Sequence, residues 1–147
     1  MAKISKILYA TDFSEGSAIA AEYARALADL HQAQVLVLHV ANELADSNRL
    51  RIQSDNYAEL ERSVEKLALT NMKEFCPRYF KAGSYETRLE IGIPFKVIND
   101  VAKSEKVDLI VVGTHGRTGL ALVVLGSTAA RVVRKSAVPV LTVPTLA

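Results

Sequence analysis

The sequence predicts an α/β fold built on a single open, mainly parallel, five-stranded sheet with helices on both faces, a Rossmann-like arrangement. Short apolar runs alternate with amphipathic helical patterns along the chain, which is typical of parallel strands joined by helical crossovers. Two of these runs, 33–41 and 107–113, are apolar at nearly every position, as interior strands are. The 147 residues contain no repeat and no linker, so we expect one domain over 1–147.

The first strand, helix and second strand follow one another closely. The run 4–12 contains β-branched and aromatic residues and ends in small and polar ones, so it predicts a buried strand followed by a turn. Ser14 is a suitable N-cap for a helix over 14–32, where alanine and leucine recur at helical spacing. The second strand is expected over 33–41.

The middle of the chain combines a polar loop with a long helix. Residues 42–56 are polar and lack a clear period, so they predict a loop. Apolar residues on one face of 57–76 predict an amphipathic helix, which Pro77 should end or kink. The alternation over 85–92 predicts a strand with one wetter face, near an edge of the sheet.

The C-terminal part supplies the remaining elements. A helix is expected over 93–106, with Pro94 in its first turn, where proline is tolerated. The strongly apolar strand 107–113 follows it. A helix over about 127–135 and a final strand over 138–144 complete the predicted order.

Composition excludes several classes of function. The chain is 50% hydrophobic and 23% charged, with a net charge of +2 and dispersed lysine and arginine, so nucleic acid is not an expected partner. Its single cysteine, Cys76, excludes an intramolecular disulfide and is expected to be buried. No run approaches ~20 apolar residues, so no membrane span is predicted. The short N-terminal apolar run ends at Asp12, so we expect no signal peptide and a cytoplasmic location.

Residues with ligand-binding chemistry follow two of the predicted strands. The first strand ends in Ala10-Thr11-Asp12, and the fourth ends in Gly113-Thr114-His115-Gly116. In open parallel sheets, ligands bind beyond the carboxyl ends of strands, where the strand order reverses. The sequence therefore predicts that both strand ends meet at one crevice.

The glycine-rich stretch 113–126 is suited to anion binding. Glycines let backbone N–H groups converge, and a helix that begins after Gly126 would present unpaired N–H groups and the hydroxyls of Ser127 and Thr128. Arg117, in the loop, and Arg131 are possible charge partners. The stretch matches neither the P-loop nor the dinucleotide fingerprint, and its spacing alone is equally consistent with a structural turn.

Three segments carry a resemblance over essentially the whole chain: ILYATDFSEGS at 7–17, VLVLHV at 35–40, and 108–143. With these segments the sequence resembles the universal stress protein family. Its nucleotide-binding branch has two glycines separated by two residues, then nine residues, then Gly-Ser or Gly-Thr. Gly113, Gly116 and Gly126-Ser127 match this spacing. The resemblance implies the ATP-binding branch.

The resemblance also implies a role for each site residue. Asp12 would lie near the ribose or a bound Mg²⁺, which suits a carboxylate that acts together with phosphate oxygens. The adenine would be bordered by Ala10, Thr11 and Val40. The ribose and phosphates would be surrounded by Gly113, His115 and Gly116, and the outer phosphates would be held by Gly126, Ser127 and Thr128. Arg117, in the loop, would be a charge partner.

Three of these residues also have another interpretation. Asp12 could simply cap the helix that begins near Ser14. His115 has no evident nucleophile or orienting carboxylate, which favours a backbone role over that of a catalytic base. Ser127 is more typical of a helix cap or phosphate ligand than of a nucleophile.

The apolar segment 120–125 is either a lid over the nucleotide or a buried interface, because an exposed patch of this kind is unusual in monomers. The family pairs subunits through its last strand, which here corresponds to 138–143. The resemblance therefore implies a homodimer through that strand.

The resulting prediction is a nucleotide-dependent sensor or regulator of the stress response that binds ATP and Mg²⁺. One alternative is a slow ATPase or self-phosphorylating enzyme that uses the same site, although no convincing base or arginine finger is evident. Another alternative is a nucleotide-free dimeric interaction module.

Overall fold

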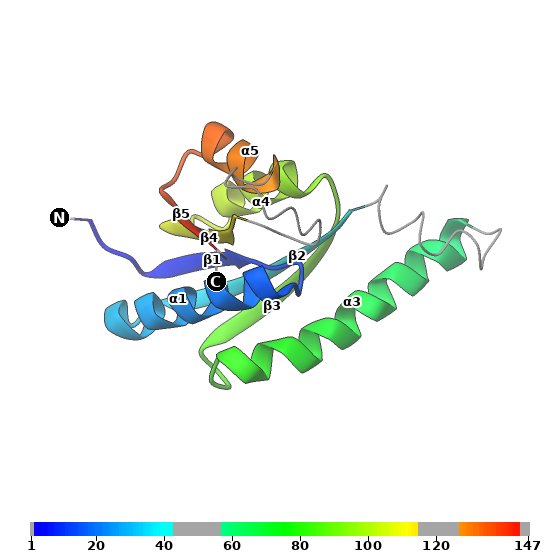
Figure 1. The fold of residues 1–147 in the computed structure, drawn as a ribbon, viewed down its shortest axis with the longest axis horizontal. Helices are drawn as coiled ribbons and strands as arrows, with labels where there is room; N and C mark the ends of the chain where they lie inside the picture. The colour runs from blue at the N-terminus through cyan, green and yellow to red at the C-terminus, as the bar shows by residue number, and fades with distance from the viewer. Residues whose placement is uncertain (1, 43–56, 115–126, 145–147) are drawn as a thin grey trace.

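The computed structural model describes residues 2–42, 57–114 and 127–144 and contains one five-stranded sheet (Figure 1). Its strand order is β3-β2-β1-β4-β5, and every pair of neighbours is parallel. The strands are β1 Lys6–Ala10, β2 Gln34–Asn42, β3 Tyr85–Gly92, β4 Leu109–Gly113 and β5 Val140–Val143. The predicted α/β fold is confirmed.

Helices cover both faces of the sheet, as Figure 1 shows. The described helices are α1 Glu15–His31, α3 Tyr57–Tyr79, α4 Pro94–Ser104 and α5 Ser127–Lys135. One buried cluster joins α1 and α3 to one face of the sheet, and a second joins α4 and α5 to the other. Within the described residues, no helix is both long and apolar enough to cross a membrane.

The two clusters divide the strand residues by alternation. On β1, Ile7 and Tyr9 belong to the α1–α3 side, whereas Leu8 belongs to the α4–α5 side. On β4, Val111 and Ile110 divide in the same way. Successive side chains of a strand point to opposite faces, so a strand covered on both faces must be apolar throughout.

The position of β3 in the sheet matches the polar residues on one face of its sequence. Among the described strands, β3 pairs only with β2 and lies at one edge, as the alternation over 85–92 predicts. β5 lies at the other edge of this described sheet, beside β4.

The prediction for Pro77 is wrong in one respect, because α3 continues through it to Tyr79. Proline removes one helical hydrogen bond, but here it lies in the last turn, where few such bonds follow. Phe75, Cys76 and Phe80 around it are buried, and Phe80 N–H still donates to the Cys76 carbonyl at 2.9 Å. Packing of the C-terminal end of α3 on the core outweighs the loss of the helical hydrogen bond that Pro77 cannot donate. Cys76 is buried as expected, and burial raises the pKa of its thiol to about 11.

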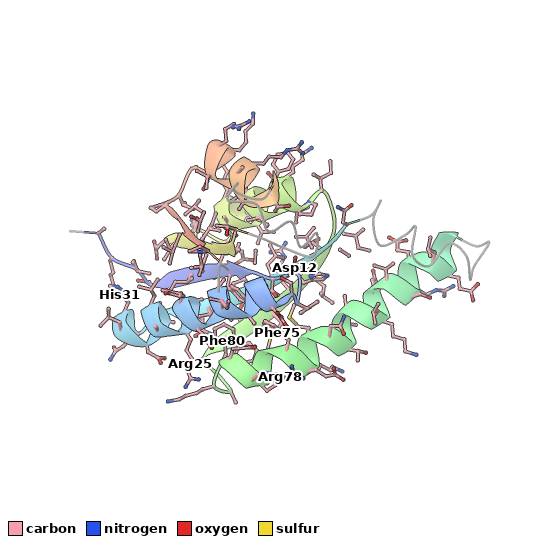
Figure 2. The ribbon with its side chains drawn as sticks, in the orientation of Figure 1. Asp12, Arg25, His31, Phe75, Arg78 and Phe80 are labelled. Atoms are coloured by element: carbon pink, nitrogen blue, oxygen red, sulfur yellow. The ribbon has the colours of Figure 1, made fainter. Side chains whose placement is uncertain are left out.

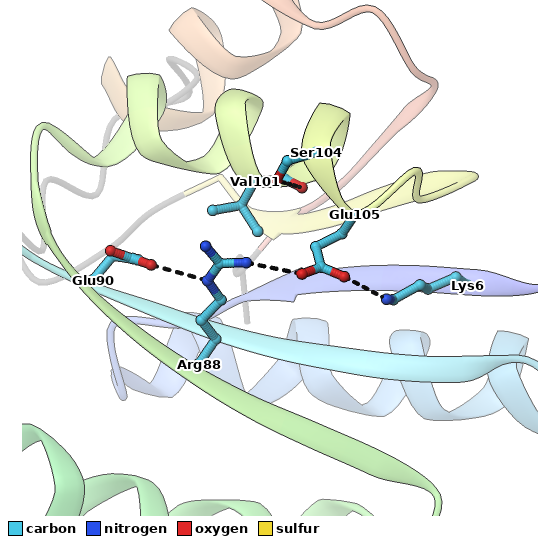
Figure 3. Close-up of polar contacts among 6 residues, drawn as sticks. All are labelled: Lys6, Arg88, Glu90, Val101, Ser104 and Glu105. Carbon is cyan, nitrogen blue, oxygen red and sulfur yellow. Dashed lines mark hydrogen bonds and ion pairs between the residues drawn. The ribbon is translucent and has the colours of Figure 1, made fainter.

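Ion pairs tie the amino end of β1 to the end of α4 and to β3 (Figure 3). The Glu105 carboxylate accepts from Lys6 Nζ at 2.8 Å and from Arg88 Nη1 at 2.9 Å, and Arg88 Nε donates to Glu90 Oε1 at 2.9 Å. The hydrogen bond and charge of Lys6, followed by the charge of Arg88, hold the pKa of Glu105 below its ordinary value. Lys6 and Glu105 lie at the amino end of β1, whereas Arg88 and Glu90 lie further along the sheet, opposite Leu38 and Val40 of β2.

Candidate functional site

The carboxyl ends of β1 and β4 lie side by side in the middle of the sheet. The two strands pair directly, with Tyr9 opposite Val111, and the chain leaves β1 for β2 on its other side. The strand order therefore reverses between β1 and β4, which is where open α/β sheets bind ligands. This places Ala10, Thr11 and Asp12 beside Gly113, as the sequence predicts.

Thr11 is buried, and its polar atoms are engaged inside the protein. Its N–H donates to the Leu38 carbonyl at 2.9 Å. Its hydroxyl oxygen accepts from Phe13 N–H at 3.0 Å and from the Ser17 hydroxyl at 2.5 Å. Thr11 thus joins β1 to β2 and to the first turn of α1, and these bonds fix the loop at the strand end.

Asp12 follows directly and is half-buried beside the start of α1 (Figure 2). Its Oδ1 accepts from Ser14 N–H at 3.0 Å. The N-cap of α1 is Ser14, whose hydroxyl accepts from Ser17 N–H at 3.2 Å, as expected. The carboxylate of Asp12 therefore braces the turn before the helix, while the capping role itself falls to Ser14.

Phe13 completes this turn with a left-handed backbone, at φ 65°. This conformation is uncommon for a residue with a side chain and persists only where its surroundings hold it. The Phe13 ring packs against the His39 ring, with centroids 4.4 Å apart, and against Phe75 at 5.6 Å.

His39 is a residue of this site that the sequence pattern did not single out, since it reads as a structural residue on β2. It is buried, and its Nδ1 lies 2.7 Å from the Thr11 carbonyl oxygen. A carbonyl oxygen only accepts, so Nδ1 carries the hydrogen in this contact. The signal available in the sequence was its position directly before Val40, a predicted site residue at the carboxyl end of the same strand.

Gly113 meets the backbone of α1. A Cβ placed on it would lie 3.1 Å from the Gly16 carbonyl oxygen and 3.6 Å from Ser17 N. Glycine at this position is therefore explained by the close approach of β4 to the first turn of α1. Thr114, the next residue, is buried and donates its N–H to the Val143 carbonyl at 3.0 Å.

The remaining predicted residues divide between described and undescribed parts of the chain. His115, Gly116, Arg117 and Gly126, together with the apolar segment 120–125, lie outside the described residues. Ser127 begins α5, and Thr128 is exposed in its first turn. Arg131, one turn further along, places its guanidinium 5.2 Å from the centre of the Phe95 ring on α4.

Electrostatically, the described part of this site offers one carboxylate beside buried neutral groups. Burial raises the pKa of Tyr9 above its ordinary value, although its hydrogen bonds with the side chains of Ser17 and Thr11 act in the opposite direction. In the part of the chain that the structure describes, no three histidine, cysteine or acidic side chains gather as a metal site. Asp12 alone suits Mg²⁺ only when phosphate oxygens complete the coordination, as is usual for this ion.

A groove of about 320 Å³ lies elsewhere, between α1 and α3. It is lined by Glu22, Arg25, Ala26, Asp29, Arg78 and Tyr79 (Arg25 and Arg78 are labelled in Figure 2). Its two arginines are balanced by two carboxylates, one of which, Asp29, lies 3.7 Å from Arg25. None of these residues belongs to a strand end, so the switch point remains the better candidate.

Comparisons with known proteins bear on the family and the fold of this chain. Residues 3–144 match the Universal stress protein family. Universal stress protein MJ0577 of Methanocaldococcus jannaschii is 33% identical over 94% of this chain and 93% of its own, and universal stress protein YxiE of Bacillus subtilis is 32% identical over 95% and 98%.

Solved structures show the same arrangement over the whole chain. The structure of MJ0577 superposes with a TM-score of 0.75 and 32% identity, covering 99% of both chains. A universal stress protein in complex with cAMP superposes with a TM-score of 0.64 and 25% identity, covering 99% of this chain and 100% of the other. The match of sequence and fold over nearly all residues leads to one conclusion: this chain belongs to the universal stress protein family.

Proposed function

We propose that this protein binds an adenine nucleotide, ATP, at the carboxyl ends of β1 and β4 and acts as a nucleotide-dependent regulator in the stress response. The observation that carries the proposal is the reversal of strand order between these two strands, with Asp12 at the end of one and Gly113 at the end of the other. A relative of the same fold was solved with cAMP, which is itself an adenine nucleotide.

In this proposal, different residues at the strand ends contact the base, the ribose and the phosphates of the nucleotide. Ala10, Thr11 and Val40 border the base, and Thr11 acts by holding the loop because its polar atoms are already engaged. Asp12 lies beside the ribose. Gly113, at the end of β4, lies near the ribose and the phosphates. His115, Gly116, Arg117, Gly126, Ser127 and Thr128 surround the phosphates.

Negative charge is favoured at the start of α5, where the first N–H groups of a helix have no helical partners. Mg²⁺, when bound, would neutralise phosphate charge. Asp12 is the residue of this chain that would hold it, with the phosphate oxygens as its other ligands.

The proposal includes a homodimer formed through 138–143. β5 is an edge strand of the described sheet and pairs there only with β4, so one side of its backbone is available for a second copy. In this arrangement, residues 120–125 serve either as a lid on the nucleotide or as part of the interface.

The direct test is calorimetric titration of the nucleotide-stripped protein with ATP, with and without Mg²⁺. Gly126→Asp places a carboxylate among the proposed phosphate ligands and should abolish binding by charge repulsion. Ala82→Asp adds the same charge in an exposed turn and should bind as the wild type does. Absence of wild-type binding up to about millimolar ATP, a level at which binding contributes only about −4 kcal/mol, would reject the proposal.

A further inference from the structure

Four buried polar side chains connect the proposed nucleotide site to the interior of the protein. Tyr9, Thr11, Ser17 and His39 are each no more than 5% exposed, and together we name them the Thr11 network. They come from β1, from the loop after it, from α1 and from β2. Burying polar groups is costly unless they bond to one another, so such a group is retained only in a defined geometry.

The Thr11 network is continuous from the core to the strand end. The Tyr9 hydroxyl donates to the Ser17 carbonyl at 2.5 Å and lies 2.7 Å from the Ser17 hydroxyl oxygen. The Ser17 hydroxyl in turn donates to the Thr11 hydroxyl oxygen at 2.5 Å. Thr11 is therefore held from the side of α1 by a group that is itself held by the core.

His39 holds Thr11 from the opposite side, through the backbone. Its Nδ1 donates to the Thr11 carbonyl oxygen at 2.7 Å. Because a trans peptide is planar, fixing this carbonyl also fixes the N–H of Asp12, which points the opposite way. The bond from His39 thus sets the plane of the peptide that leads into Asp12.

Phe13, which follows Asp12, is also held by the imidazole ring of His39. Phe13 has a left-handed backbone, and its ring packs on the His39 ring at 4.4 Å between centroids. Its N–H is held by the Thr11 hydroxyl oxygen. His39 therefore contacts the turn both before and after Asp12.

We propose that His39 is a positioning residue of the nucleotide site, whose Nδ1–H and ring fix the Thr11–Phe13 turn and so place the Asp12 carboxylate for the ligand. This inference rests on the proposed function. His39 acts through Thr11 and Phe13, and its contribution is the orientation of a turn that a free chain would not keep.

The test compares two amide replacements of His39 by ATP titration. In His39→Asn, the new side-chain N–H can lie near the position of Nδ1, whereas the amide introduced by His39→Gln lies one carbon further out. Asparagine keeps the donor but loses the ring that packs on Phe13, so His39→Asn should weaken ATP affinity by about threefold. His39→Gln and His39→Leu should weaken it about tenfold, because they also lose the hydrogen bond.

Two controls separate positioning from general stability. His31→Leu changes an exposed histidine at the end of α1 and should leave affinity unchanged. Val107→Ala truncates a buried side chain just before β4, at the amino end of the sheet, and should lower the melting temperature without lowering affinity. If His39→Leu does not fold, the comparison between the asparagine and glutamine variants still decides the matter.

The outcomes are distinct. Equal affinity in the asparagine and glutamine variants, or wild-type affinity in His39→Leu, would overturn the positioning role while leaving nucleotide binding intact. A wild-type protein that binds no nucleotide would reject the proposed function, and this inference with it. Affinity that follows the Nδ1-like donor and not the melting temperature would support the inference.

Discussion

Gly113, at the end of β4, packs directly on the carbonyl of Gly16 in the first turn of α1. A methyl group at Gly113 would lie 3.1 Å from that oxygen, closer than ordinary van der Waals contact. The neighbour is backbone in a turn that Ser14 and Thr11 also hold, so it has little freedom to withdraw.

Gly113→Ala should therefore destabilise the folded protein by about 1–3 kcal/mol, as overpacked positions do. The measurement is the midpoint and slope of urea unfolding for the wild type and the variant. An unchanged midpoint would mean that α1 moves aside without cost and that close approach does not explain this glycine.

Glu105 should make stability depend on pH in the acidic range. Its pKa is lower in the folded protein than its ordinary value of 4.5, chiefly through the hydrogen bond and charge of Lys6. A lowered pKa contributes stability that is present above the unfolded value and is lost as the pH falls through the folded one.

Glu105→Gln should consequently be less stable than the wild type at pH 7, and the difference should shrink below about pH 4.5. The check is denaturant unfolding at a series of pH values, with Glu74→Gln on the exposed side of α3 as the control. A difference that stays constant with pH would show that the ion pairs of Figure 3 do not contribute.

The proposed dimer can be tested at the outer side of β5. The Pro139 carbonyl accepts a hydrogen bond from β4, and the Val143 carbonyl accepts one from Thr114 just after it. The backbone groups of successive strand residues face opposite sides, so the N–H and carbonyl of Thr142, next to Val143, face away from β4. Thr142→Pro removes an outward N–H while sparing the bonds to β4, and edge positions tolerate proline.

Light scattering at about micromolar protein should give a dimer mass for the wild type and a monomer mass for Thr142→Pro, because edge pairing depends on these N–H groups. A wild-type monomer would remove the dimer from the proposal. A variant that remains dimeric would move the interface away from β5.

The regulatory part of the proposal requires that ATP favour one arrangement of the protein over another. Amide hydrogen exchange of peptides covering 113–126 should therefore slow on addition of saturating ATP. Gly126→Asp serves as the control, because it should show no such change. Equal exchange with and without ATP in the wild type would remove the sensor mechanism while leaving nucleotide binding in place.

Much of the fold follows from the sequence because the relevant signals are local. Runs such as 107–113 are apolar at nearly every position, and this pattern indicates a strand covered on both faces. The edge position of β3 follows from its alternation in the same way. The two strand ends that we propose as the site could also be located from the sequence, since Asp12 and Gly113 each end an apolar run.

Contacts between distant residues were decided only by the tertiary structure. The sequence shows a glycine at 113 but not that Gly16 lies against it, and it shows a histidine on a strand but not the Thr11 carbonyl that it holds. Pro77 stays inside α3 because of packing that no local pattern contains. The physical reason is common to all three: periodicity and propensity act over a few neighbouring residues, whereas close approach and burial depend on which segments the folded sheet brings together.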